Sequence, residues 1–147
     1  MAFAHPVLDQ AAAARHEEAR FASGMDHEAA AMERAGRAVA LGIEQSLGER
    51  FGSVAERMPV LLIVGKGHNG GDVALAAMHL ARRYPALRFF AVLLRDVQKM
   101  RPLTRAAWQR FCQAATELTL VPADALHLRR LREALPEFDG IVIDGGF

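Results

Sequence analysis

The sequence has little of several features that mark large classes of protein. Its 147 residues include one cysteine, Cys112, which excludes an internal disulfide and a cysteine-rich zinc site. No stretch approaches the roughly 18 to 20 apolar residues of a membrane span, and residues 1–10 lack the basic region that begins a signal peptide. We therefore expect a cytoplasmic protein with no membrane partner.

Charge of one sign is also scarce. The chain has 18 lysines and arginines against 17 aspartates and glutamates, intermixed along its length, for a formal net charge of +1. A nucleic-acid-binding face needs a local excess of positive charge, so nucleic acid is not an expected partner. With 52% hydrophobic residues, the chain has enough material for the core of one domain, which we expect over residues 1–147.

Helix and strand patterns alternate along most of this domain. N-terminal helices are expected over residues 7–47, as two segments at 7–22 and 27–47, and an α/β core is expected over 60–147. The predicted strands of the core are 60–64, 88–94, 118–121 and 141–144. The predicted helices between them are 71–83, 102–115 and 125–135. This alternation is typical of right-handed crossovers and of a parallel sheet with helices on both faces.

Two helical faces are expected to pack against the core. The stripe in helix 27–47 consists of Met32, Gly36, Val39, Ile43 and Leu47. Glycine costs a helix about 1 kcal/mol relative to alanine, so we interpret Gly36 as a point of close approach between helices. In helix 102–115, Trp108 is expected to pack rather than to stack on a base, and Cys112 is expected in the core rather than as a reactive thiol.

A glycine-rich segment follows the first predicted strand. The run reads Gly65-Lys-Gly-His-Asn-Gly-Gly-Asp72 and leads into a predicted helix. Its glycines permit positive φ angles and close approach of a bound group, and the N–H groups at the start of the helix favour an anionic or polar partner. A phosphate or a ribose is therefore the expected ligand. Lys66 suits the neutralisation of a phosphate, although an exposed loop lysine is the more common case.

A carboxylate ends the last predicted strand. Asp144 closes the apolar run that begins at Ile141, and Gly145 and Gly146 open a loop. Because ligands of open α/β sheets bind beyond the carboxyl ends of the strands, Asp144 and the loop 65–72 are expected to share one crevice. The sequence stops within this loop, so we expect an incomplete core, truncated at the C-terminus.

Taken alone, the pattern Gly65-x-Gly-x-x-Gly70 also fits a dinucleotide fingerprint, with Asp96 as a ribose acceptor. Such a match is weak, and Asp72 would place a carboxylate near the N–H groups that should hold a pyrophosphate. A Walker motif is excluded because no Gly-Lys-Ser/Thr follows at the required spacing.

The longer pattern is more specific. Gly-x-Gly-x-Asn-Gly-Gly-Asp after a strand resembles the signature of the YjeF N-terminal domain family, the NAD(P)H-hydrate epimerases, which typically read Gly-x-Gly-Asn-Asn-Gly-Gly-Asp-Gly. The segment from Ala31 to Gly36 is similar to the family's Leu-Met-Glu-x-Ala-Gly helix, and Ile141 to Asp144 is similar to its Val-Asp-Ala-Leu-Phe-Gly strand end. The three matches cover residues 25–147 in the family's order.

The resemblance implies a fold and an activity. The fold is a Rossmann-like three-layer α/β/α sandwich with a mainly parallel sheet, commonly a homodimer. The activity is that of an isomerase in nicotinamide nucleotide repair, which interconverts the R and S epimers of hydrated NADH and NADPH. The resemblance also implies a site: the substrate-binding residues are His68, Asn69, Gly70, Gly71 and Asp72, and a potassium ion is held by Asn69 and Asp144.

The chemistry of these side chains is compatible with that site. Amide and carboxylate oxygens are hard ligands that suit a hard cation. Epimerisation next to a ring nitrogen needs a positioned acid/base, and Asp144, in a partly desolvated crevice, is the expected catalytic residue. Asp72 is a second candidate, with helix capping as its alternative role.

Several positions depart from the family pattern. His68 replaces an asparagine, Val73 replaces a glycine, and Gly145 and Gly146 stand where the family has Ala-Leu or Ala-Ile, which we expect to loosen the loop beside Asp144. The later Asp-Ile-Pro-Ser-Gly motif has no counterpart in these residues. The alternative function is therefore a catalytically inactive module of the same fold that binds a nucleotide or a protein partner.

Overall fold

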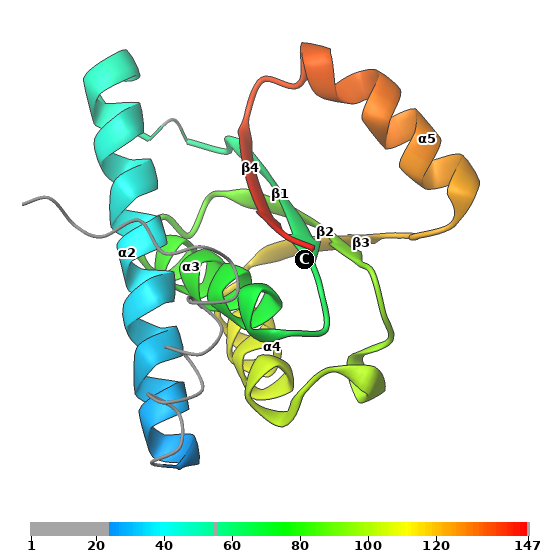
Figure 1. Cartoon of the computed structure of the whole chain (residues 1–147). Helices are drawn as coiled ribbons and strands as arrows, with labels where there is room; N and C mark the ends of the chain where they lie inside the picture. The colour runs from blue at the N-terminus through cyan, green and yellow to red at the C-terminus, as the bar shows by residue number, and fades with distance from the viewer. Residues whose placement is uncertain (1–23, 55, 147) are drawn as a thin grey trace, which may run out of the picture. The chain divides into compact units, whose positions relative to one another are not determined.

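The computed structural model of the chain describes residues 24–54 and 56–146 (Figure 1). The chain divides into two compact units, residues 1–31 and 32–147. The helix predicted over residues 7–22 lies outside the described residues. In the first unit, helix α2 (Met25–Phe51) begins after Gly24, which has a φ of 111° and accepts a 3.1 Å hydrogen bond from the His27 N–H.

The rest of the chain is an alternation of strands and helices. The strands are β1 (Pro59–Val64), β2 (Arg88–Leu93), β3 (Glu117–Val121) and β4 (Ile141–Gly145). The helices are α3 (His68–Arg83), α4 (Pro102–Ala114) and α5 (Ala125–Ala134), with short 3₁₀ turns η1 (Val97–Lys99) and η2 (Leu135–Glu137). All four strands are parallel, in the order β3-β2-β1-β4.

The sheet separates the helices into two layers. From β1 the chain passes through α3 to β2 and through α4 to β3, and α5 then carries it back across the sheet to β4. Because crossovers between parallel strands are right-handed, this reversal places α5 on the face opposite to α3 and α4, as Figure 1 shows. The prediction of a Rossmann-like α/β/α fold with a parallel sheet is thus confirmed.

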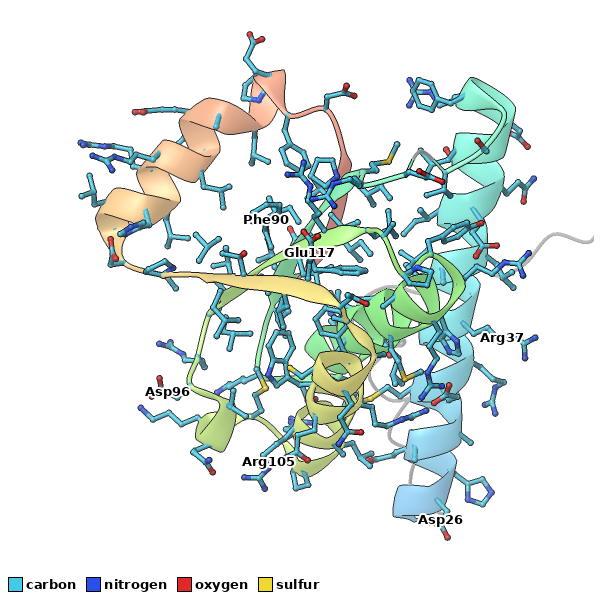
Figure 2. All side chains as sticks on the ribbon, turned by 180° about the vertical axis from the view of Figure 1, so that it is seen from behind. Asp26, Arg37, Phe90, Asp96, Arg105 and Glu117 are labelled. Carbon is cyan, nitrogen blue, oxygen red and sulfur yellow. The ribbon has the colours of Figure 1, made fainter. Side chains whose placement is uncertain are left out.

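The core lies between the sheet and the layer formed by α3 and α4. Ten of the sixteen residues of α3 are buried. Phe111 of α4 packs edge-on against Phe89 of β2 with ring centroids 5.1 Å apart, and Trp108 lies 5.4 Å from Phe111 on the same side. The packing role predicted for Trp108 is therefore confirmed. On the opposite face, to which Figure 2 shows Phe90 pointing, α5 contributes no buried residue.

The prediction of burial is wrong for two residues, Val39 and Cys112. Val39 is 39% exposed, and Ala40 takes its place because it follows Gly36 by four residues on the side of α2 that packs against α3. A Cβ on Gly36 would lie 2.5 Å from Leu75 Cβ, which confirms the close helix approach. Cys112 is exposed, because it is rotated about 100° from the buried Phe111 around α4. Its remaining partial burial raises the pKa of the thiol.

Within the part of the chain that the structure describes, no helix is both long enough and apolar enough to cross a membrane.

Candidate functional site

The glycine-rich segment is mostly helical. Helix α3 begins at His68 rather than at residue 71, so only residues 65–67 form a loop. The early start is stabilised by the Gly67 carbonyl, which accepts hydrogen bonds from the N–H groups of Gly70 (3.1 Å) and Gly71 (3.3 Å). The residues predicted to bind the substrate therefore form the first turn of a helix and the residue that follows it.

Close packing, and not positive φ, explains the glycines of this segment. Among the described glycines only Gly24 and Gly52 have positive φ, so the glycines of this segment do not use the left-handed backbone that they permit. A Cβ on Gly70 would collide with the carbonyl of Gly65, and one on Gly65 would lie 2.6 Å from the Gly145 oxygen. The first turn of α3 therefore lies directly against the loop that precedes it.

The ends of β1 and β4 meet at this loop. The Gly65 N–H donates a 3.1 Å hydrogen bond to the Gly145 carbonyl, and a Cβ on Gly145 would collide with the Asn69 carbonyl oxygen. The structure thus brings the segment after β1 and the end of β4 together, at the carboxyl edge where open α/β sheets bind ligands.

Helix α4 fixes the loop from the other side. The Arg101 N–H donates a 3.0 Å hydrogen bond to the Lys66 carbonyl, and the Thr104 hydroxyl donates one of 2.9 Å to the Gly67 carbonyl. Thr104 is fully buried, so loss of this bond would leave its hydroxyl buried without a hydrogen-bond partner, which is energetically costly. Two consecutive carbonyls of the loop are therefore held by the start of α4.

The side chains of the predicted site differ in exposure. Asn69 is exposed, whereas His68 and Asp72 are half-buried. Gly67 occupies the cap position of α3, and Asp72 lies one turn inside the helix, so Asp72 does not occupy the cap position that the sequence suggested.

Asp144 lies at the exposed end of β4. The expectation of a partly desolvated carboxylate is wrong, because Asp144 alternates with the buried Ile143 and points away from the core. Its Oδ1 accepts a 2.9 Å hydrogen bond from the Gly146 N–H, which orients the carboxylate. The predicted loosening around Gly145 is also wrong, because Gly145 belongs to β4 and pairs with Val64.

The chemistry of two donors is compatible with the potassium ion that the family resemblance implies. Asn69 and Asp144 are both exposed residues with side-chain oxygen, and the Asn69 carbonyl lies against Gly145, the residue after Asp144. Hard oxygen donors of this kind fit a hard cation. Among the described residues no group of three or more His, Cys, Asp or Glu side chains is placed to hold a metal ion.

One basic residue of this region was not predicted from the sequence. Arg101, the cap residue of α4, places Nη1 3.3 Å from Nε2 of His68. Its position just before Pro102, after the strand next to β1, was the available signal, because it puts Arg101 at the same edge of the sheet. Asp96, the ribose acceptor of the dinucleotide interpretation, is exposed and forms a 3.6 Å ion pair with Lys99. Figure 2 shows Asp96 projecting outward.

Comparison with known proteins gives two findings. The model of the family described as YjeF-related protein N-terminus matches residues 28–145. The structure is similar to that of a yeast protein, titled "Crystal structure of yeast ynu0, YNL200c", with a TM-score of 0.64 and 17% sequence identity. The match covers 97% of this chain and 57% of the yeast chain, so the present chain spans little more than half of that relative. No curated protein matches significantly.

Proposed function

Because the chain belongs to the YjeF-related N-terminal family, we propose that it is an NAD(P)H-hydrate epimerase, acting on hydrated NADH and NADPH. The observation that carries the proposal is the contact between the first turn of α3 and the end of β4. This contact sets Asn69, one of the residues that the family resemblance assigns to substrate binding, against Gly145, the residue after Asp144. The proposed site thus draws on two segments that are far apart in sequence.

The backbone of this region suits a nucleotide. The loop 65–67 and the start of α3 lie at the carboxyl edge of the sheet, where the positive end of the helix dipole favours an anionic group. Gly70 and Gly71 are buried against Gly65 and Met32, so a phosphate or a ribose would approach this edge at the exposed residues Lys66 and Asn69.

The proposed chemistry needs one acid/base group. Inversion at the hydroxyl-bearing carbon next to the ring nitrogen requires either loss and return of hydroxide or opening and closure of the ring. Asp144, oriented by the Gly146 N–H, is the carboxylate in position to move that proton. A potassium ion would be held by Asn69 and Asp144 and would supply positive charge beside the substrate.

One observation favours the second candidate, a nucleotide-binding module without turnover. Asp144 is exposed, and a catalytic carboxylate gains from exclusion of water. In the epimerase, the bound substrate itself would have to cover this side chain. The choice between the two functions therefore depends on turnover, since both include nucleotide binding.

The test is epimerisation of a mixture of R and S hydrated NADH in potassium buffer. We expect turnover by the parent chain and a loss of at least about a hundredfold in Asp144→Asn, the scale of a general acid/base. Asp139→Asn is the matched control, because Asp139 is another exposed aspartate, just before β4, and should keep parental activity. A folded parent that binds NADH without turnover would identify the binding module instead.

A further inference from the structure

We infer that Arg101, together with Lys66 and His68, binds the phosphate groups of a nucleotide ligand. The inference deepens the proposed function, since it rests on a nucleotide as the ligand of this edge of the sheet. It concerns a side chain on α4 that the family's loop pattern does not include.

The main chain fixes the position of Arg101. Its own N–H bonds to the Lys66 carbonyl, and Thr104, one turn further along α4, bonds to the Gly67 carbonyl from a fully buried position. The start of α4 and the loop 65–67 are thereby joined by two hydrogen bonds. The backbone of Arg101 is consequently held next to the loop, and its guanidinium reaches the His68 imidazole.

The positive charge of the Arg101 guanidinium is not neutralised by an ion pair with a described residue. Its side-chain contact is with His68, Nη1 to Nε2 at 3.3 Å, and no carboxylate of the described residues lies within 4.0 Å of the guanidinium. Other arginines, such as Arg57 with Glu117 and Arg110 with Glu33, do form such pairs. Lys66, exposed on the loop itself, adds a second cation within the same short segment.

This combination matches phosphate chemistry. A guanidinium presents several N–H donors in a planar fork that can bind two phosphate oxygens at once, whereas an ammonium acts as a point charge. The 3.3 Å contact with the His68 imidazole places the Arg101 guanidinium beside the first turn of α3.

The strand order gives the bound nucleotide a direction. Arg101 follows β2 and Asp144 ends β4, and these two strands flank β1 on opposite sides. The strands β2 and β4 are two strand spacings apart, roughly 10 Å. Phosphates held near Arg101 would therefore leave the nicotinamide ring on the β4 side of the loop, where Asp144 lies.

The experiment compares ligands with and without phosphate by titration calorimetry. The probes are NADH, inorganic pyrophosphate and reduced nicotinamide riboside, which carries no phosphate. We expect Arg101→Gln to weaken NADH binding by about tenfold or more and to leave riboside binding unchanged. Arg101→Lys should fall between the parent and the glutamine variant.

Arg83→Gln is the matched control. It removes the same charge from an exposed position at the far end of α3 and should bind NADH like the parent. Equal losses in Arg83→Gln and Arg101→Gln, or equal losses for NADH and the riboside, would overturn the inference, as would a parent chain that binds no NADH. Competition of pyrophosphate with NADH in the parent, lost in Arg101→Gln, would support it. None of these readouts requires turnover, so the inference survives if the epimerase proposal fails.

Discussion

Val73 and Gly145 share one small space where α3 meets β4. Val73 is 4% exposed, and a Cβ on Gly145 would lie 2.6 Å from Val73 Cγ2. The family pattern has a glycine and an alanine at these two positions. In the present chain the larger side chain, Val73, lies on the helix, and the strand has glycine. The two departures from the pattern therefore lie in contact with each other, and the Asn69 carbonyl packs against the same point of Gly145.

The pair can be tested by a double-mutant cycle. Gly145→Ala alone should destabilise the fold by about 1–3 kcal/mol, because the new methyl group meets Val73 and the Asn69 carbonyl. Val73→Gly alone should also destabilise it, through loss of buried apolar surface. In the double variant, we expect urea unfolding to show a favourable coupling of about 0.5 kcal/mol or more. Strict additivity would show that the two positions are independent.

The glycines of the site provide a second prediction. Gly70→Ala should lower the free energy of unfolding by more than about 2 kcal/mol, because its methyl group meets the main chain of Gly65, which cannot move alone. Gly42→Ala is the control, an exposed position of α2 with nothing within 4 Å of the added carbon. It should stabilise by roughly 0.5–1 kcal/mol. A neutral Gly70→Ala would contradict the close packing of loop and helix.

At the scale of elements, one carboxylate connects three helices. Glu33 of α2 lies 2.7 Å from Arg110 Nη1 of α4 and 3.0 Å from His79 Nε2 of α3. Partial burial acts to raise the pKa of the Glu33 carboxyl, but the hydrogen bonds and charges of Arg110 and His79 outweigh it and lower the pKa. The ionised carboxylate is therefore the form that the folded protein favours.

The sign of the resulting pH dependence follows. Since the folded-state pKa of Glu33 lies below its ordinary value of 4.5, the ionised network stabilises the fold above that pH. The contribution is lost as the pH falls through the lowered pKa. Both pairs are partly exposed, so Glu33→Gln should cost only about 1 kcal/mol at pH 7 and progressively less below pH 4.5. Urea unfolding at pH 7 and pH 3.5 measures this, with Glu44→Gln as a control of equal charge change on the same helix.

The elements themselves were largely predictable from the sequence. The strands 60–64 and 141–144 are apolar runs of buried-strand character, and each observed strand overlaps its prediction. The start of α3 was not predictable, because it depends on the Gly67 carbonyl and on packing against Gly65, contacts that local pattern does not contain. For the same reason Arg101 was missed, since its neighbour His68 lies 33 positions away in the sequence.

At the scale of the whole sheet, its two faces are unequally covered. Helix α3 is buried along most of its length, whereas in α5 Leu128 and Leu131 are only half-buried and Leu126 is exposed. The start of α5 is stabilised locally, by Asp124 Oδ1, which accepts 3.0 Å hydrogen bonds from the N–H groups of Leu126 and His127. The face of the sheet that carries Asp144 is thus the less protected one.

This inequality predicts the pattern of hydrogen exchange. Amides of β1 and α3 should exchange only through global unfolding, while those of α5 should exchange through local opening at a much smaller free energy, because little buried surface holds the helix. Native-state exchange followed by mass spectrometry would resolve the two segments.

Matched leucine variants test the same idea energetically. Leu80→Ala, in the fully buried part of α3, should cost about 2–5 kcal/mol, and Leu131→Ala in α5 clearly less. Equal protection of α5 and α3, together with equal costs for the two variants, would mean that α5 packs on the sheet as firmly as α3 does. If α5 opens locally as expected and does not contact the ligand, the hydrogen-exchange rates of its amides should be the same with and without bound NADH. Protection of α5 by NADH would instead place that helix over the bound ligand.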